Sequence, residues 1–275
     1  MMALTAQAIM AHEGEEIRQE ITPRDAILYA LSVGYGTDDL PFVAGPTPRI
    51  APDMANVLCH PGFFMQAVGA TWAGVVHAEQ RVTFHDHLTL NTPLIARTRA
   101  TAVVDKGEGR GMFTTFAREI RRESDGAALV TVSQTDACRF DGGTGQAGTP
   151  PEALAPLPER APDQTLAIQI PERAALLYQL NGDTNPLHSD PEVARASGFD
   201  APILHGLCSF GHAARAITRA HAGRLREIAA RFTAVVYPGE ALELDLWRDA
   251  QEVRFRLRVP ARSVTALDRG LVRLD

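Results

Sequence analysis

The chain has 275 residues, of which 45% are hydrophobic and 22% charged, and its formal net charge at pH 7 is −6. This composition is typical of a globular protein of one large or two modest domains and excludes a disordered chain. A net negative charge offers no general attraction for nucleic acid or an anionic membrane, so we expect neither as a partner. An anionic substrate would need a local basic patch.

Cys59, Cys138 and Cys208 are odd in number and widely spaced, which does not fit a disulfide framework or a zinc site. No uncharged apolar run is long enough to cross a bilayer. The first seven residues lack the basic and apolar parts of a signal peptide. Together these features predict a cytoplasmic protein in a reducing compartment.

The first half begins with a predicted helix that ends near Gly34. Thr22 is its expected cap, and Pro23 lies in its first turn. A mixed apolar segment follows at 62–75. Strand-like runs then follow at 81–88, 94–104, 112–121 and 127–140. The sequence Ser-Asp-Gly at 124–126 is a hairpin signal between the last two runs.

A Gly- and Pro-rich stretch without apolar periodicity covers residues 141–165 and is typical of a linker. It separates two segments whose predicted elements run in the same order. We therefore predict an N-terminal module at 1–145, a linker at 146–165 and a C-terminal module at 166–275.

The second half repeats the plan. Helices are predicted at 171–180, at 190–198 and at 206–222, where apolar residues recur at helical spacing. Strands are predicted at 228–237, 241–248, 251–259 and 265–274. A helix followed by an antiparallel meander predicts an α+β fold, with a sheet wrapped around a long helix in each module.

One short loop after the 171–180 helix carries Asp183, Asn185 and His188. Gly182 can adopt backbone angles closed to other residues, and Pro186 restricts the residue before it to an extended shape. A carboxylate and an imidazole on one water can act as base and then return a proton as acid. An asparagine can orient that water without adding charge.

Gly206 opens the predicted helix at 206–222. A backbone N–H at a helix N-terminus can stabilise a developing oxyanion, and the absence of a Cβ allows a carbonyl to approach closely. The loop and this helix start together suit the addition of water to an activated carbonyl compound.

The motif Y-x-L-x-G-D-x-N-P-L-H at 178–188, followed by G-F-D-x-P-I-L-H-G-L at 198–207, resembles the signature of the (R)-specific enoyl-CoA hydratases, also called hydratase 2 or MaoC-like dehydratases. Segments 28–34, 77–80, 104–107 and 231–239 resemble the two-module form of that family. The resemblance implies a double hot-dog fold and covers the chain from about residue 15 to its end.

The resemblance also implies a lyase that hydrates trans-2-enoyl-CoA reversibly to (3R)-hydroxyacyl-CoA, as a homodimer and without metal or redox cofactor, CoA being part of the substrate. In the family the equivalents of Asp183 and His188 are catalytic, that of Asn185 lies with them, and the N–H of the residue matching Gly206 forms the oxyanion hole. The expected substrate contacts are His77, Ala78, Lys106, Asp183, Thr184, Asn185, Pro186, Leu187, His188, Gly206 and Phe232.

Other interpretations of single residues stay open. Lys106 is the only lysine, either by chance in a solvated turn or for contact with the acyl or CoA part. His77 is either structural at a strand start or part of the acyl-CoA site with Ala78. Phe232 is either a core aromatic or a contact of the acyl chain. His188, His205 and His212 do not have the spacing of a known metal site. Cys208 has no evident base beside it, so a nucleophilic role is not expected.

After the shared Leu-Tyr-x-Leu pattern, residues 32–40 contain neither a histidine nor Asn-Pro. The first module is therefore predicted to be non-catalytic and to shape the substrate site. Two alternatives to the hydratase are a hot-dog acyl-CoA thioesterase and a non-catalytic acyl-CoA-binding subunit.

Overall fold

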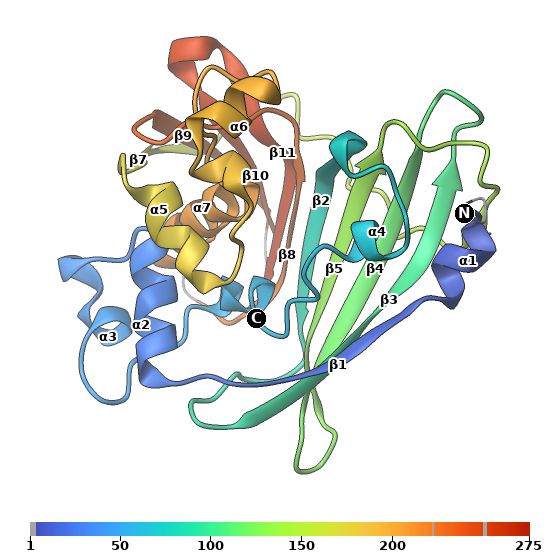
Figure 1. Ribbon diagram of the computed structural model, residues 1–275. Helices are drawn as coiled ribbons and strands as arrows, with labels where there is room; N and C mark the ends of the chain where they lie inside the picture. Colours follow the sequence, from blue (N-terminus) through green and yellow to red (C-terminus); the bar gives the residue numbers. More distant parts are fainter. Residues whose placement is uncertain (1–3, 222, 250–251) are drawn as a thin grey trace. The chain divides into compact units, whose positions relative to one another are not determined.

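The computed structural model describes residues 4–221, 223–249 and 252–275 (Figure 1). Its contacts divide the chain into two compact units. Unit 1 contains Met1–Gln19, Leu58–His87 and Pro93–Ala153, and unit 2 contains Glu20–Val57, Leu88–Thr92 and Leu154–Asp275. Residues 20–57, although they precede the predicted linker, therefore pack with the C-terminal part of the chain.

Unit 1 is built on an antiparallel sheet in the order β1-β3-β4-β5-β2, with the two-residue strand β6 paired to β3. The strands are β1 Glu13–Glu20, β2 Val75–Phe84, β3 Pro93–Asp105, β4 Met112–Arg122, β5 Ala128–Cys138 and β6 Ala147–Gly148. Alternation of buried and exposed residues along β3 gives this sheet one apolar face and one polar face.

The start of β2 carries a bulge. His77 pairs with Asp136 of β5 and Glu79 pairs with Thr135, so Ala78 is an extra residue between them. A bulge interrupts the two-residue period that marks a strand in a sequence. This is why the predicted strand began at Arg81, six residues late.

The helical elements of unit 1 are short: α1 Ala6–Ala11, α4 Phe64–Ala67 and the 3-10 turn η3 Trp72–Gly74. They cover the apolar face of the sheet, where Ile9, Phe64 and Met65 pack with Val103 and Phe116. Thr5 caps α1 by accepting the N–H of Ala8 at 3.1 Å. The segment at 62–75 thus forms two short turns.

In unit 2 the strands pair antiparallel in the order β8-β11-β10-β9-β7. Its strands are β7 Gln164–Gln169, β8 Leu225–Phe232, β9 Ala241–Asp249, β10 Glu252–Val259 and β11 Val264–Leu274. Strand β7 begins inside the region predicted as linker. Its alternating, half-buried residues place it at the sheet edge beside β9.

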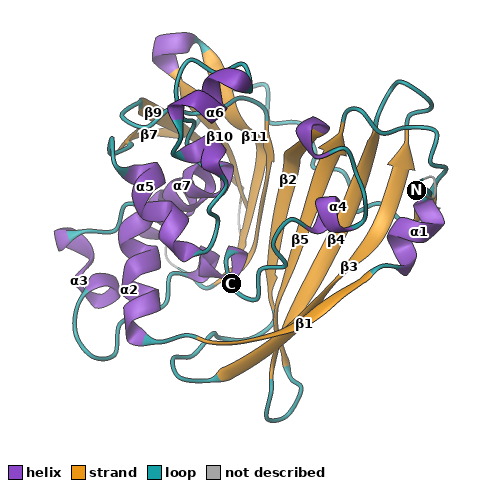
Figure 2. Cartoon of the chain, viewed as in Figure 1, coloured by secondary structure: helices purple, strands orange, loops and turns teal. Residues whose placement is uncertain are grey.

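The long helix α7, Gly206–Ala220, packs against β7 and β8 of this sheet. Phe210, Ala213, Ala214 and Ile217 on its inner side are fully buried. A buried helix held by an antiparallel sheet is the arrangement predicted for this module, and Figure 2 labels the helix α7 among the purple helices of unit 2.

The remaining helices of unit 2 come from both halves of the sequence. They are α2 Pro23–Ser32, η1 Thr37–Asp39, α3 Leu40–Val43, η2 Pro52–Asn56, α5 Ala174–Tyr178, η4 Gln179–Asn181, η5 Pro186–His188, α6 Pro191–Ala196 and η6 Pro260–Arg262. Thr22 and Asp25 form a reciprocal capping box at α2, so the predicted cap is confirmed. Helix α2 lies beside α5 (Figure 1).

No helix in the described part of the chain is both long enough and apolar enough to cross a membrane.

Candidate functional site

The loop that carries the predicted triad begins where α5 ends and tightens into the 3-10 turn η4. Gly182 then adopts φ = +114°, a left-handed conformation in which a residue with a Cβ would be strained. This reversal sends the chain from the helix into residues 183–188. The prediction that a glycine breaks the helix at this point is confirmed.

Two aspartate- and asparagine-type turns shape the loop. The Asp183 carboxylate accepts the N–H of Asn185 at 3.1 Å through Oδ1. Asn185 Oδ1 in turn accepts the N–H of Leu187 at 3.1 Å and caps the 3-10 turn η5, in which Pro186 is the first residue. Both side chains therefore fix the backbone of the loop through their Oδ1 atoms. The second carboxylate oxygen of Asp183, Oδ2, takes no part in these two turns.

His188 has a defined tautomer. Its Nδ1 lies 2.9 Å from the backbone carbonyl oxygen of Ile203. A carbonyl oxygen can only accept, so Nδ1 carries the proton and donates, and Nε2 of the neutral ring keeps its lone pair. Burial lowers the pKa of His188, against smaller opposing effects from this hydrogen bond and from Asp183. A neutral ring with a basic Nε2 is the form that can accept a proton.

His205, at the residue before α7, lies against His188. The two rings stack with centroids 3.7 Å apart, and the Tyr178 ring lies 4.9 Å from His205. His205 Nε2 donates to the backbone carbonyl of Asp183 at 3.2 Å. Burial, and then the neighbouring His188, lower the pKa of His205 to about 4. Polar atoms of Asp183, His188 and His205 lie within 4.8 Å of one another.

Gly206 is the first residue of α7. His205 is the N-cap residue and its side chain makes no capping hydrogen bond, so the first N–H groups of the helix are not capped. A Cβ placed on Gly206 would lie 3.0 Å from two ring carbons of Phe232, at the end of β8. The aromatic ring thus packs directly against this helix start, and a larger residue at 206 would displace it.

The loop is also anchored to α2. Asn181 Nδ2 donates to Ser32 Oγ at 2.9 Å, and Ser32 Oγ donates to the carbonyl of Tyr29 at 2.7 Å. Ser32 is buried, and its own carbonyl lies 3.4 Å from Cys208 Sγ. Burial raises the pKa of the Cys208 thiol well above its ordinary value, which argues against a nucleophilic role.

Among the remaining predicted contacts in this loop, Thr184 and Pro186 are exposed and Leu187 is half-buried. Three others belong to unit 1. His77 and Ala78 lie at the β2 bulge, where His77 Nε2 is 3.0 Å from Gln80 Oε1. Lys106 lies in the turn between β3 and β4, with its ammonium 5.5 Å from the centroid of the Phe113 ring.

The Lys106 turn is held by the preceding residue. The Asp105 carboxylate accepts N–H groups of Gly107, Gly143 and Gly145 at 2.9, 3.0 and 2.9 Å. These bonds lower the pKa of Asp105. The exposed lysine therefore stands on an ordered turn.

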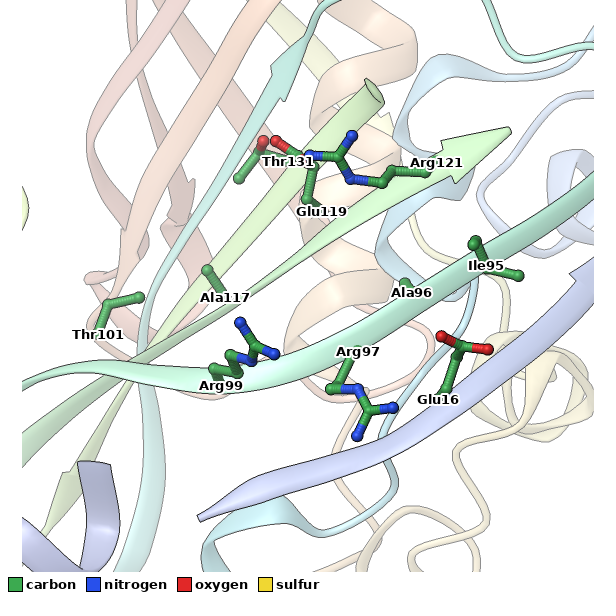
Figure 3. A pocket seen from close by; sticks show the side chains of 10 residues that line it. All are labelled: Glu16, Ile95, Ala96, Arg97, Arg99, Thr101, Ala117, Glu119, Arg121 and Thr131. Carbon is green, nitrogen blue, oxygen red and sulfur yellow. The ribbon is translucent and has the colours of Figure 1, made fainter. Parts of the chain in front are cut away.

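An open hollow of about 430 Å³ lies on the polar face of the unit 1 sheet (Figure 3). Its lining includes Arg97, Arg99 and Arg121, and ion pairs join Arg97 and Arg99 to Glu13 and Arg121 to Glu119. None of the predicted site residues lines this hollow. Its arginines are engaged with acidic neighbours, and we assign no chemistry to it.

The structure thus brings together Asp183, Asn185, His188, Gly206 and Phe232 within unit 2. Sequence reasoning considered His205 as part of a metal set without known ligand spacing, and it missed Ser32. His205 contacts Asp183 across 22 positions of the chain, and Ser32 contacts Asn181 across 149 positions. The class of protein defined by the fold and the site is a hot-dog protein in which a loop with Asp183 and His188 lies beside the residue that precedes a long helix.

Comparisons with known proteins identify the family. Residues 153–268 match the MaoC like domain, and residues 20–139 match the MFE-2 hydratase 2 N-terminal domain. The chain is 37% identical over 240 residues to "3-hydroxyacyl-thioester dehydratase Y" of Mycobacterium tuberculosis, covering 83% of this chain and 82% of that protein. It is 35% identical over 256 residues to "Enoyl-CoA hydratase ChsH3" of the same organism, covering 88% of each.

Among solved structures, a MaoC-like dehydratase from Phytophthora capsici superimposes with a TM-score of 0.89 at 26% identity, over 99% of this chain and 98% of that one. The chain belongs to the MaoC-like dehydratase and hydratase 2 family and has its double hot-dog fold.

Proposed function

We propose that this protein is an (R)-specific 2-enoyl-CoA hydratase, which in reverse acts as a (3R)-hydroxyacyl-CoA dehydratase. The observation that carries the proposal is the joint position of Asp183 and His188, whose polar atoms lie within 4.8 Å. A free basic nitrogen beside a carboxylate is the equipment that water addition requires. The curated relatives named as hydratase and dehydratase support the same reaction.

In the hydration direction, a water molecule binds between the Asp183 carboxylate and Nε2 of His188, and Asn185 orients it. As the water oxygen bonds to the β-carbon, one of its protons passes to this pair. The electron pair of the double bond moves towards the thioester oxygen. The pair then returns a proton to the α-carbon, so that one water is added and both groups recover their original charge.

The negative charge on the thioester oxygen is met by the N–H of Gly206. This group is at the positive end of a 15-residue helix, and such an amide needs no reorganisation as the charge develops. Packing of Phe232 against Gly206 gives the site an apolar wall. We assign the acyl chain to that wall, and His77, Ala78 and Lys106 to the CoA and acyl parts.

The experiment that tests this function is hydration of crotonyl-CoA and longer 2-enoyl-CoAs by the full chain, followed as loss of the enoyl thioester absorbance. Coupling to an (R)-specific hydroxyacyl-CoA dehydrogenase should give signal, and coupling to an (S)-specific one should not. Release of free CoA instead would identify a thioesterase. Binding of acyl-CoA without turnover would identify a non-catalytic subunit.

We further propose one active site per chain, with the first module shaping the acyl site, and a homodimeric state. The lack of a histidine in the turn at residues 32–40 supports the single active site per chain. Titration with a tight-binding acyl-CoA analogue should saturate near one per chain, and light scattering gives the mass of the particle.

The reaction as proposed uses no metal or redox cofactor. Every proton transfer in it is assigned to Asp183 or His188, and the charge on the thioester oxygen is assigned to the N–H of Gly206. Turnover should therefore survive dialysis against a chelator. A cytoplasmic location is proposed because the three cysteines are free and buried, which suits a reducing compartment.

A further inference from the structure

His205 makes three contacts that no proton-transfer step uses. Its Nε2–H donates to the carbonyl of Asp183, one face stacks on His188, and the Tyr178 ring lies near it. The ring has a relative exposure of 1%. A histidine fixed by a hydrogen bond and by aromatic packing is held in one orientation.

The second ring nitrogen of His205, Nδ1, shows why this ring does not take up a second proton. Nδ1 is buried and has no hydrogen-bond partner. A proton on Nδ1 would be a buried donor without an acceptor, which costs free energy. The ring therefore stays neutral, with its proton on Nε2, where the Asp183 carbonyl accepts it.

We propose that His205 is a positioning residue with two separable tasks, one for each feature of its ring. Its Nε2–H holds the backbone of Asp183 and so places the carboxylate on the water. Its neutral flat face covers His188 and keeps water from one side of that imidazole. The inference rests on the proposed hydratase function and adds a residue that acts through both members of the acid–base pair.

The two tasks predict different failures. Without the Nε2–H, the Asp183 backbone is no longer held and kcat falls, while KM changes little because the carboxylate acts on water. Without the flat face, water reaches His188 and the burial that lowers its pKa is relieved. At low pH His188 is protonated and cannot act as base, so kcat/KM falls. This acid limb of the pH profile of kcat/KM then moves to higher pH.

Other groups that face His188 are the same in each variant. Helix α6 packs against η5, Asp183 acts on His188 through its charge, and Tyr178 of α5 lies against His205. Their titratable and charged groups are Asp183, Tyr178, Asp190, Glu192 and Arg195.

Two substitutions separate the tasks. In His205→Gln the amide nitrogen can occupy the place of Nε2 and keep the donor, but the flat ring is lost. In His205→Phe the ring is kept and the donor is lost. We expect His205→Gln to retain kcat within about threefold and to shift the acid limb upward. We expect His205→Phe to lose about 10- to 100-fold in kcat, with the acid limb unchanged.

His205→Asn removes the same donor with a shorter side chain and replaces the phenylalanine variant if that protein is insoluble. Because His205→Asn lacks both the donor and the flat ring, it should show a lower kcat and also an acid limb of kcat/KM at higher pH. His212→Gln is the matched control, because His212 is another buried histidine of the same segment with an unpartnered Nε2. Its melting temperature can change, but its acid limb should not.

A readout without turnover keeps this inference distinct from the proposed function. The His188 ring is titrated by nitrogen-edited NMR in the wild type and in His205→Gln, and its pKa should be higher in the variant. An inactive wild type would refute the hydratase and leave this titration informative. Full kcat in both His205→Phe and His205→Asn, or an unchanged His188 titration in His205→Gln, would overturn the inference.

Discussion

Residues 28–40 and residues 177–188 start from the same pattern, Leu-Tyr-x-Leu, on helices α2 and α5 of unit 2. Each then passes through a left-handed glycine, Gly34 with φ = +90° and Gly182 with φ = +114°. The two tyrosine rings, Tyr29 and Tyr178, meet edge to face with centroids 6.3 Å apart. Up to this point the two segments are local copies.

They differ in what their aspartates contact. Asp39 in the first segment is buried and accepts Arg215 Nη2 at 2.6 Å and lies 3.1 Å from Arg219 Nη1, so its charge is neutralised by α7. Asp183 in the second lies beside the neutral His188 and His205. A carboxylate paired with arginines serves packing, whereas one beside a neutral imidazole is available to a water molecule.

The strongest way to break this comparison is to remove the first segment. A fragment of residues 160–275 loses Ser32 as acceptor for Asn181 and Asp39 as partner of Arg215. It also exposes the side of α7 that Asp39 and Gly34 cover. We expect an insoluble or inactive fragment. Soluble expression and enoyl-CoA turnover are the measurements, and a fully active fragment would contradict the proposed dependence on the first segment.

A second test removes the aspartate or the histidine that is proposed to be catalytic. Asp183→Ala or His188→Ala should lower kcat by about 10²–10⁴-fold, because each is proposed to transfer protons. Asn185→Ala should have a smaller effect, since asparagine only orients the water. Circular dichroism checks the fold, and the exposed His87→Ala is the control. Near-normal turnover by folded His188→Ala would falsify the mechanism.

The helix start gives a sharper contrast. Gly206→Ala places a Cβ 3.0 Å from the Phe232 ring, whereas Gly36→Ala in the first segment meets nothing within 4 Å. We expect Gly206→Ala to lower kcat by about tenfold or more, because a displaced ring or helix start misplaces the N–H that meets the oxyanion. Gly36→Ala should leave kcat unchanged. Equal kcat in the two variants would remove Gly206 from the site.

The smallest effect on turnover is expected from Asp39→Asn. Loss of the charge weakens the hydrogen bonds to Arg215, and unfolding in urea should give a loss of about 1–3 kcal/mol. The exposed Asp38→Asn is its control. kcat of the folded protein should stay within about twofold. A large fall in kcat without loss of stability would mean that Asp39 takes part in the chemistry.

The sequence allowed the loop to be predicted because its determinants are contiguous. Gly182, Pro186 and the three polar side chains lie within seven residues, and their turns depend on near neighbours. Helix α7 and most strands were predictable from apolar periodicity, but the start of β2, which contains the Ala78 bulge, was not. Residues 20–57 pack in unit 2 through contacts between distant positions, which no local pattern specifies.

The same distant contacts bear on how the protein folds. The bond from Asn181 to Ser32 joins residues 149 positions apart, and that from Arg215 to Asp39 joins residues 176 apart. Closing such loops is slow relative to local structure formation, and α2 leaves the ribosome long before α7. We therefore expect secondary structure to recover early on refolding from urea and enzymatic activity to return last, when α2 docks beside the loop that carries Asp183 and His188.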